Sequence, residues 1–285
     1  MIPSSFEYFA PTSLKQALEL LSTYKEDVKL IAGGQSLVPL MKLRLAKPKY
    51  LIDLTRISDL NTIRREGETI LIGALATHTQ LERSELLRTD CPILPQTAAT
   101  IGDVQVRNQG TLGGSLAHAD PAGDMPAAIL AVEAEMKVSG PAGERWIKAE
   151  DFFVGFLTST LEPHEILTEI RVRAQRECKS AYLKAAQRAS GFAVVGVAAC
   201  LNLGADGTCE DIALGVTGVG DKAYRAVGVE KILRGNKLEA ALIDQAAAQV
   251  THGVDPLEDI NGSKEYRAHL AFVYTVRAIQ AASRA

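Results

Sequence analysis

The chain has 285 residues, of which 47% are hydrophobic and 23% charged, and its formal net charge at pH 7 is −3. A chain of this length can form roughly two or three domains, each with its own core. Charges of both signs are mixed along the sequence, and no run of five or six basic residues occurs. A nucleic-acid-binding protein is therefore not expected.

Signals for export, membrane insertion and metal binding are missing from the sequence. The N-terminal segment has no basic stretch followed by an apolar core, and the longest mainly apolar run, residues 192–204, is too short to span a bilayer. We therefore expect a cytoplasmic protein. The four cysteines form no Cys-x-x-Cys pair and the five histidines no i, i+4 pair, so we expect no zinc or iron–sulfur ligands in this chain.

The first predicted unit is a small α/β unit over residues 1–55. Residues 13–24 place apolar side chains at helical spacing, with Thr12 or Ser13 as the N-cap. The two strands predicted after this helix are residues 28–32 and 49–55.

The second predicted unit is an α+β unit over residues 56–174. It mixes strand-like apolar runs with short helical segments. The expected elements are a strand at 69–77, helices at 77–89 and 91–102, a Gly-Pro-Ala-Gly hairpin turn near 140–143 and a strand at 165–172.

The third predicted unit covers residues 175–285. It begins with β-rich runs from residue 178, in which the sequence GADGT at 204–208 indicates a turn between two strands. After residue 224, apolar residues recur at three-and-four spacing, which predicts a few helices packed on an antiparallel sheet. These helices are expected within 227–235, 238–250 and 263–285.

Two segments combine paired glycines with hydroxyl side chains. The sequence AGGQS, residues 32–36, follows a predicted strand, and TLGGS, residues 111–115, repeats the pattern. Glycine pairs let the backbone pass close to a ligand, and successive backbone N–H groups can bind a pyrophosphate. Each segment alone is also compatible with an ordinary tight turn. Neither matches a P-loop, since no Gly-Lys-Ser/Thr follows.

A third glycine segment, GVGDKA at 218–223, fits a variant of the dinucleotide-binding pattern Gly-x-Gly-x-x-Ala. It follows a predicted hairpin instead of opening a βαβ unit, and no later strand with an acidic end is evident. We therefore do not expect it to bind a dinucleotide.

Three stretches resemble the FAD-binding medium subunit of the molybdenum hydroxylases, the family that includes carbon monoxide dehydrogenase and xanthine dehydrogenase-type enzymes. They are AGGQSLVPLMKLRLAKP, TIGDVQVRNQGTLGGSLAHADPAGDMPA, and AEDFF with the following EILTEIRV. The resemblance extends over essentially the whole chain and includes both ends. It implies an α+β fold of the vanillyl-alcohol-oxidase (PCMH) type, with two α/β FAD-binding subdomains and a C-terminal domain of antiparallel sheet with helices.

The resemblance also implies residue roles in FAD binding and no catalytic residue in this chain. The two glycine segments would bind the pyrophosphate, Ile101 would lie along the cofactor, and Asp124 would bind a hydroxyl of the adenosine half. Leu167 would pack near the flavin or adenine edge, Lys184 would approach the isoalloxazine, and Phe192 stands where some relatives have a tyrosine. The full set implied for FAD binding is Ala32, Gly33, Gly34, Gln35, Ser36, Ile101, Thr111, Gly113, Gly114, Ser115, Asp124, Leu167, Lys184 and Phe192.

As a family member, this chain would be an oxidoreductase subunit that passes electrons through FAD. A large subunit with molybdopterin cytosine dinucleotide would oxidise the substrate, and a small subunit with two [2Fe-2S] clusters would deliver the electrons. The acceptor would be NAD⁺ or a quinone, and the assembly a dimer of heterotrimers. Two alternatives are a self-sufficient FAD-dependent oxidase of the same fold and a flavin-free binding module.

Simpler interpretations of several polar residues remain open at this point. Asp103 is compatible with a turn residue and Asp124 with a helix cap, and Lys184 is compatible with a solvated strand residue. His118 and Asp120 lie close together in sequence, but no third group orients them, so acid–base catalysis is not expected.

Overall fold

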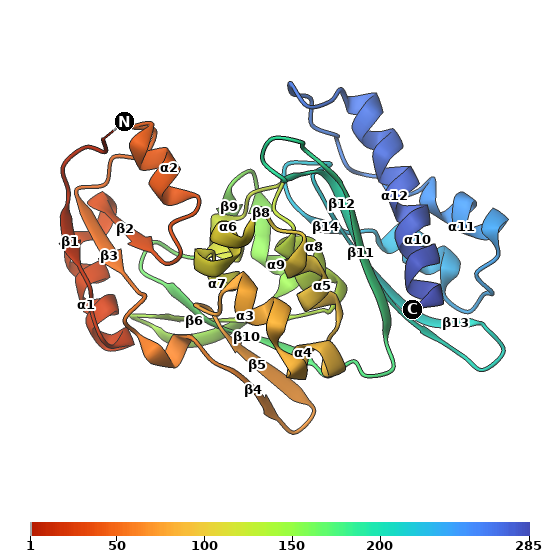
Figure 1. The fold of residues 1–285 in the computed structure, drawn as a ribbon, viewed down its shortest axis with the longest axis horizontal. Helices are drawn as coiled ribbons and strands as arrows, with labels where there is room; N and C mark the ends of the chain where they lie inside the picture. The colour runs from red at the N-terminus through yellow and green to blue at the C-terminus, as the bar shows by residue number, and fades with distance from the viewer. Residues whose placement is uncertain (1) are drawn as a thin grey trace.

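The computed structural model describes residues 2–285, arranged as three units along the longest axis of the molecule (Figure 1). A small sheet lies at the N-terminal end, a five-stranded sheet with short helices lies in the middle, and a four-stranded sheet with three helices lies at the C-terminal end. Buried apolar side chains form three clusters, one centred in each unit.

The first unit is a three-stranded parallel sheet in the order β1-β3-β2. Its elements are β1 (Glu7–Phe9), α1 (Leu14–Tyr24), a 3-10 helix (Lys25–Asp27), β2 (Val28–Ile31), α2 (Leu37–Lys42) and β3 (Tyr50–Asp53). Ser13 is the N-cap of α1, because its hydroxyl accepts a hydrogen bond from the N–H of Gln16 at 3.3 Å. The predicted helix and both predicted strands are confirmed. The short elements β1 and α2 were not predicted, since neither is long enough to show a periodic pattern.

The middle sheet has the strand order β4-β5-β10-β6-β7, and all neighbouring pairs are antiparallel. Its strands are β4 (Ile63–Glu66), β5 (Thr69–Gly73), β6 (Glu135–Gly140), β7 (Gly143–Lys148) and β10 (Ile166–Arg173), preceded by a 3-10 helix (Ser58–Leu60). The predicted hairpin turn between β6 and β7 is confirmed, and Gly143 there has a φ of +106°, which favours glycine. The predicted strands β5 and β10 are also confirmed, although β5 ends at Gly73.

Short helices connect and cover this sheet. They are α3 (His78–Arg83), α4 (Glu85–Asp90), α5 (Ile93–Ala99), α6 (Val104–Gln109), α7 (Leu112–His118), α8 (Met125–Ala131) and α9 (Ala149–Phe152), followed by the hairpin strands β8 (Phe153–Gly155) and β9 (Thr158–Ser159). The prediction of one helix over 77–89 is wrong. Ser84 adopts an extended ψ of 112° that ends α3, and its hydroxyl accepts from the N–H of Leu87 and caps α4.

The C-terminal unit is an antiparallel sheet in the order β11-β12-β13-β14, and α12 packs on β11 and β12. Its elements are β11 (Lys179–Ala186), β12 (Ala193–Leu203), β13 (Cys209–Thr217), β14 (Tyr224–Arg225), α10 (Val227–Leu233), α11 (Ala240–Ala247) and α12 (Lys264–Arg284). The predicted sheet with helices is therefore confirmed. Within residues 2–285, no helix is both long and apolar enough to cross a membrane.

The segment 218–223 is a turn between β13 and β14 that is held by polar contacts. Gly218 has a φ of +83°, its N–H donates to the carbonyl of Pro121 at 2.6 Å, and its carbonyl accepts from buried Arg267 at 2.6 Å. These contacts explain the glycine without a ligand. They agree with the expectation that this segment is not a dinucleotide site.

Helix α8 joins the middle unit to the C-terminal sheet. All seven of its residues are buried, and it packs on β12 and β13. A Cβ at Gly215 of β13 would lie 1.9 Å from the carbonyl oxygen of Ala127 in α8. The backbones of helix and strand therefore lie in direct contact, which only glycine permits at this point.

We predict that Gly215→Ala lowers the free energy of unfolding by roughly 1–3 kcal/mol, because the added Cβ overlaps the backbone of α8. Gly228→Ala in α10 is the matched control, since a Cβ there would lie 3.6 Å from its nearest neighbour. Alanine favours a helix over glycine by about 0.5–1 kcal/mol, so this variant should be at least as stable as the wild type. Urea unfolding followed by circular dichroism measures both, and equal stabilities would contradict the contact.

Candidate functional site

A cavity of about 860 Å³ lies between the first unit, the helices of the middle unit and the turn that joins β11 to β12. Ligand and cofactor pockets typically have volumes of about 300–1,000 Å³, so this one can hold a large cofactor. Of the fourteen residues implied for FAD binding, thirteen line this cavity. Lys184 is the exception among the described residues.

The first glycine segment, residues 32–36, connects the end of β2 to the start of α2 beside this cavity. Gly34 has a φ of +70°, a conformation that other side chains disfavour. Within residues 2–285, the backbone N–H groups of Gly33, Gly34, Gln35 and Ser36 donate to no protein acceptor. Successive N–H groups of this kind form a concavity that binds anions such as phosphate.

The second glycine segment, residues 111–115, is the N-cap and first turn of α7, so it is not the ordinary tight turn that was left open as an alternative. The hydroxyl of Thr111 accepts from the N–H of Gly114 at 3.1 Å. The N–H groups of Leu112 and Gly113 donate to carbonyls of the chain between β5 and α3, at 2.9 and 2.8 Å. These backbone donors are therefore already used within the protein.

The two glycine segments lie side by side. A Cβ at Gly33 would lie 1.9 Å from the carbonyl oxygen of Gln109, and a Cβ at Gly114 would lie 3.9 Å from the Cβ of Ala32. The first unit therefore contacts the end of α6 and the start of α7 through backbone atoms. The predicted convergence of the two segments on one cavity is found in the structure.

His78 is a cavity residue that the sequence interpretation missed. It is the first residue of α3, is 2% exposed, and its Nε2 lies 3.4 Å from the hydroxyl of Ser115. Burial, with a smaller effect of the Arg107 cation, lowers the pKa of His78 to about 4, so the ring is neutral at pH 7. A neutral imidazole can donate to or accept from this hydroxyl and so orients it.

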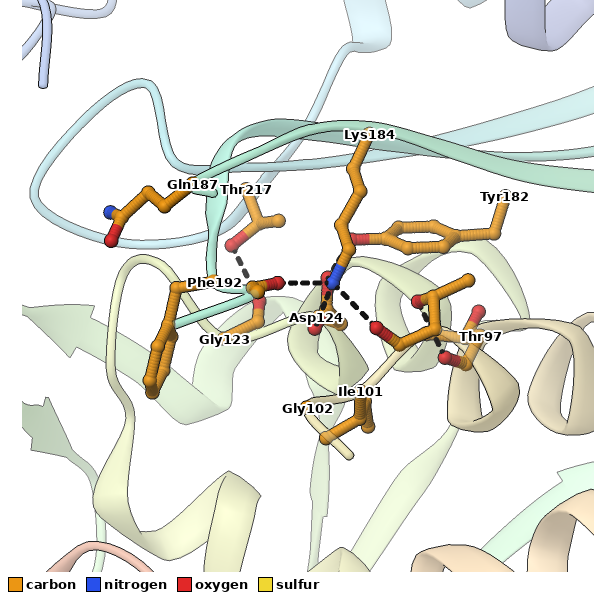
Figure 2. A network of polar contacts seen from close by, with 12 residues as sticks. Thr97, Ile101, Gly102, Gly123, Asp124, Tyr182, Lys184, Gln187, Phe192 and Thr217 are labelled. Atoms are coloured by element: carbon orange, nitrogen blue, oxygen red, sulfur yellow. Dashed lines mark hydrogen bonds and ion pairs between the residues drawn. The ribbon is translucent and has the colours of Figure 1, made fainter. Parts of the chain in front are cut away.

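Asp124, at the start of α8, is the centre of a buried polar network (Figure 2). Its side chain caps no helix; instead it accepts from the hydroxyl of Tyr182 and from the ammonium of Lys184 at 3.0 Å. Burial raises the pKa of Asp124, and the Lys184 cation opposes this rise. Burial and the neighbouring carboxylate likewise raise the pKa of Tyr182.

Lys184 extends from β11 toward this carboxylate (Figure 2), and its side chain is 8% exposed. It is therefore not a solvated strand residue. Lys184 itself does not line the cavity, but its partners Asp124 and Gly191 do, and its approach to the isoalloxazine stays a prediction.

Three apolar side chains, Ile101, Leu167 and Phe192, supply flat surface to the cavity wall. Leu167 is buried on β10, whereas Phe192 is 41% exposed at the end of the β11–β12 turn. Figure 2 shows Ile101 and Phe192 below the Asp124–Lys184 pair, on one side of it. Such surfaces suit the packing of aromatic rings.

The remaining polar candidates have structural explanations. Asp103 is the N-cap of α6 and accepts from the N–H of Val106 at 2.9 Å. His118 Nε2 and Asp120 Oδ2 are 3.9 Å apart, which exceeds a hydrogen-bond distance. No group of three or more His, Cys, Asp or Glu side chains is placed to hold a metal ion within the described residues.

A row of free N–H groups beside a large, partly apolar cavity is typical of a protein that binds a nucleotide-containing cofactor. Comparisons with known proteins identify the class. The family model for the FAD binding domain in molybdopterin dehydrogenase matches residues 4–173. The model for the CO dehydrogenase flavoprotein C-terminal domain matches residues 180–282.

Individual relatives match over their full length. A chain of carbon monoxide dehydrogenase from Hydrogenophaga pseudoflava has a solved structure with a TM-score of 0.96 and 40% identity, covering 99% of this chain and 98% of that one. The glyceraldehyde dehydrogenase medium chain of Sulfolobus acidocaldarius is 36% identical over 280 residues, covering 98% of this chain and 99% of its own. A chain of quinoline 2-oxidoreductase from Pseudomonas putida 86 has a TM-score of 0.94 and 33% identity, covering 100% of this chain and 99% of that one.

The chain belongs to the family of FAD-binding medium subunits of molybdenum-containing dehydrogenases. The predicted family, oxidoreductase class and FAD cofactor are therefore confirmed. The predicted fold, an FAD-binding domain followed by an antiparallel sheet with helices, is also confirmed.

We predict that buried His78 makes stability depend on pH. Its pKa falls from 6.5 to about 4 on folding, so between these values the unfolded chain binds a proton that the folded chain does not. The free energy of unfolding should therefore drop by roughly 3 kcal/mol, from this residue alone, as the pH falls from about 6.5 to about 4.

Urea unfolding at several pH values measures this drop in the wild type and in His78→Leu, in which it should be correspondingly smaller. His269→Leu, a substitution of an exposed residue on α12, is the control and should retain the wild-type profile. If His78→Leu retained the wild-type profile as well, the neutral buried imidazole would be ruled out.

Proposed function

We propose that this chain is the flavoprotein subunit of a molybdenum hydroxylase and holds FAD between the [2Fe-2S] clusters of a partner subunit and an external electron acceptor, NAD⁺ or a quinone. The observation that carries the proposal is the row of free N–H groups at residues 33–36 beside a cavity of about 860 Å³. When bound, FAD supplies electron transfer in single or paired steps, which suits this junction.

In this proposal the first glycine segment contributes more hydrogen-bond donors to the diphosphate of FAD than the second. The N–H groups of residues 33–36 would donate to its oxygens, as would the hydroxyls of Ser36 and Ser115, with His78 orienting Ser115. Backbone approach is possible because Gly33 has no side chain. Ile101, Leu167 and Phe192 would pack on the ring systems, and the buried Asp124 would accept from a ligand hydroxyl.

We propose that the substrate is oxidised elsewhere in the assembly. His118 and Asp120, which line the cavity and lie close together in sequence, are 3.9 Å apart, a distance that exceeds a hydrogen bond and gives no support to acid–base catalysis by this pair. The relatives include dehydrogenases of carbon monoxide and glyceraldehyde, whose substrates differ widely. Such variation around a similar medium chain supports a substrate site on a large subunit that carries molybdopterin cytosine dinucleotide.

We further propose a cytoplasmic dimer of heterotrimers, each built from this chain, the large subunit and the [2Fe-2S] small subunit. The full-length similarity to medium chains supports such partners. Within this chain, we propose domain boundaries near residues 55 and 174. The second of these positions is supported by the two family-model matches, which end at residue 173 and begin at residue 180.

The first experiment is purification from the native host, followed by an absorption spectrum and chromatography of the cofactor released on denaturation. We expect flavin bands near about 450 nm, free FAD, iron–sulfur absorbance and two co-purifying chains. Bound FAD in a solitary chain that oxidises a substrate would favour a self-sufficient oxidase. A colourless solitary chain would favour a flavin-free binding module.

We predict that Gly33→Ala abolishes retention of FAD, because a Cβ 1.9 Å from the carbonyl of Gln109 would force the glycine segments apart. Ser36→Ala removes only one hydroxyl and should weaken FAD binding by about three- to tenfold, the effect of one hydrogen bond. Gly155→Ala is the control, since a Cβ there would have only one neighbour within 4 Å, at 3.9 Å.

The FAD-to-protein ratio after gel filtration and the dissociation constant of FAD measure these effects. Circular dichroism establishes whether each variant is folded. Full FAD occupancy in folded Gly33→Ala would show that the cofactor does not depend on the contact between the segments.

A further inference from the structure

The ammonium of Lys184 has three hydrogen-bond acceptors within the protein. It donates to Asp124 Oδ2 at 3.0 Å, to the carbonyl of Thr100 at 2.9 Å and to the carbonyl of Gly191 at 2.6 Å. A lysine ammonium has three N–H donors, so this set occupies all of them. Lys184 therefore has no donor left for a ligand in the cavity.

We propose that Lys184 is a positioning residue that holds two parts of the FAD cavity wall together and so sets how these two parts meet the cofactor. That FAD is the ligand of this cavity rests on the proposed function. The two carbonyls that Lys184 binds belong to segments which are far apart in sequence but meet at the cavity (Figure 2).

The first of these segments follows α5. Thr100 precedes Ile101 and Gly102, which both line the cavity, and Gly102 has a φ of +47°. The second segment is the β11–β12 turn, in which Ser190, Gly191 and Phe192 line the same cavity. Because one ammonium binds a carbonyl from each segment, their separation is set by the length of two hydrogen bonds.

The two segments also touch directly. A Cβ at Gly191, which has a φ of +75°, would lie 3.6 Å from the Cα of Gly102. Within the β11–β12 turn, Gln187 donates to the carbonyl of Phe192 at 2.8 Å and accepts from the N–H of Gly191 at 2.9 Å. These two bonds hold residues 187–192 in one compact turn. The bond from Lys184 to the carbonyl of Gly191 therefore orients the whole turn, including the half-exposed ring of Phe192.

The position of the ammonium is itself fixed by buried partners. Asp124 Oδ1 accepts from the hydroxyl of Tyr182, so the carboxylate bonds to two residues of β11. The same region is joined to β13 by Thr217, whose hydroxyl oxygen lies 2.7 Å from the carbonyl of Pro121 and 2.8 Å from that of Gly123 and shares its single proton between them. A buried ion pair adds little net stability, but it holds its partners in one arrangement. This arrangement lies where the FAD-binding and C-terminal regions meet.

The test is Lys184→Met in the full chain, with Lys179→Met on the same strand as the matched control. Lys179 donates to the carbonyl of Ala285 on an exposed part of the strand and faces no cavity residue. Amide hydrogen exchange is measured first on the FAD-free chain. Loss of the ammonium should speed exchange in 100–102 and 187–192 by about tenfold or more, because local opening costs less free energy. Lys179→Met should leave both segments unchanged.

FAD binding and the flavin spectrum provide the second measurement. Lys184→Met should weaken FAD binding by about tenfold and shift the visible bands of the bound flavin, since Phe192 and Ile101 are displaced. A double variant, Lys184→Met with Asp124→Asn, leaves no unpaired buried carboxylate. It therefore separates the loss of the positioning role of Lys184 from a general loss of folding stability. This double variant should regain stability but retain the fast exchange in the FAD-free chain.

Three results would overturn the proposal. The first is unchanged exchange in 187–192 of Lys184→Met. The second is weakened FAD binding with unchanged exchange, which would assign Lys184 a direct ligand contact. The third is full recovery of slow exchange in the double variant. If the wild-type chain bound no FAD, the proposed function would fail, while the exchange data would still decide the role of Lys184.

Discussion

The contact between Gly33 and the carbonyl of Gln109 brings the first unit against helices α6 and α7, and the cavity depends on it. A Cβ at this glycine would lie 1.9 Å from the carbonyl oxygen, so a side chain would separate the two units. The same constraint recurs at Gly215, where β13 lies directly on α8. Both junctions between neighbouring units therefore rest on backbone packing that leaves no space for a side chain.

The two glycine segments look alike in sequence but have different physical roles. The first leaves four backbone N–H groups free beside the cavity. The second uses its N–H groups to cap α7 and to bond to the chain after β5, so it supplies structure and two hydroxyls. The anion-binding capacity of the site therefore comes mainly from residues 33–36, while α7 provides a rigid surface opposite them.

Buried polar groups in and next to the cavity wall then determine how the cavity is shaped. His78 is neutral because burial disfavours its charged form, and it faces the hydroxyl of Ser115. Lys184 remains paired with Asp124 and with two carbonyls, which fixes the segments on either side. An unpaired ammonium or carboxylate at this depth would be costly, so the network of Lys184 and Asp124 has a narrow range of geometries.

Local sequence patterns were sufficient to predict α1, the hairpin of β6 and β7, and the C-terminal sheet with its helices, because helical periodicity and turn chemistry act within a few residues. Three resembling stretches also predicted the family, and this resemblance implied thirteen residues that line the cavity. Only the tertiary structure decided the roles of His78 and Lys184. Their partners, Ser115 and Asp124, lie 37 and 60 residues away in sequence. Which polar groups meet at such separations depends on the packing of whole units, which no local pattern specifies.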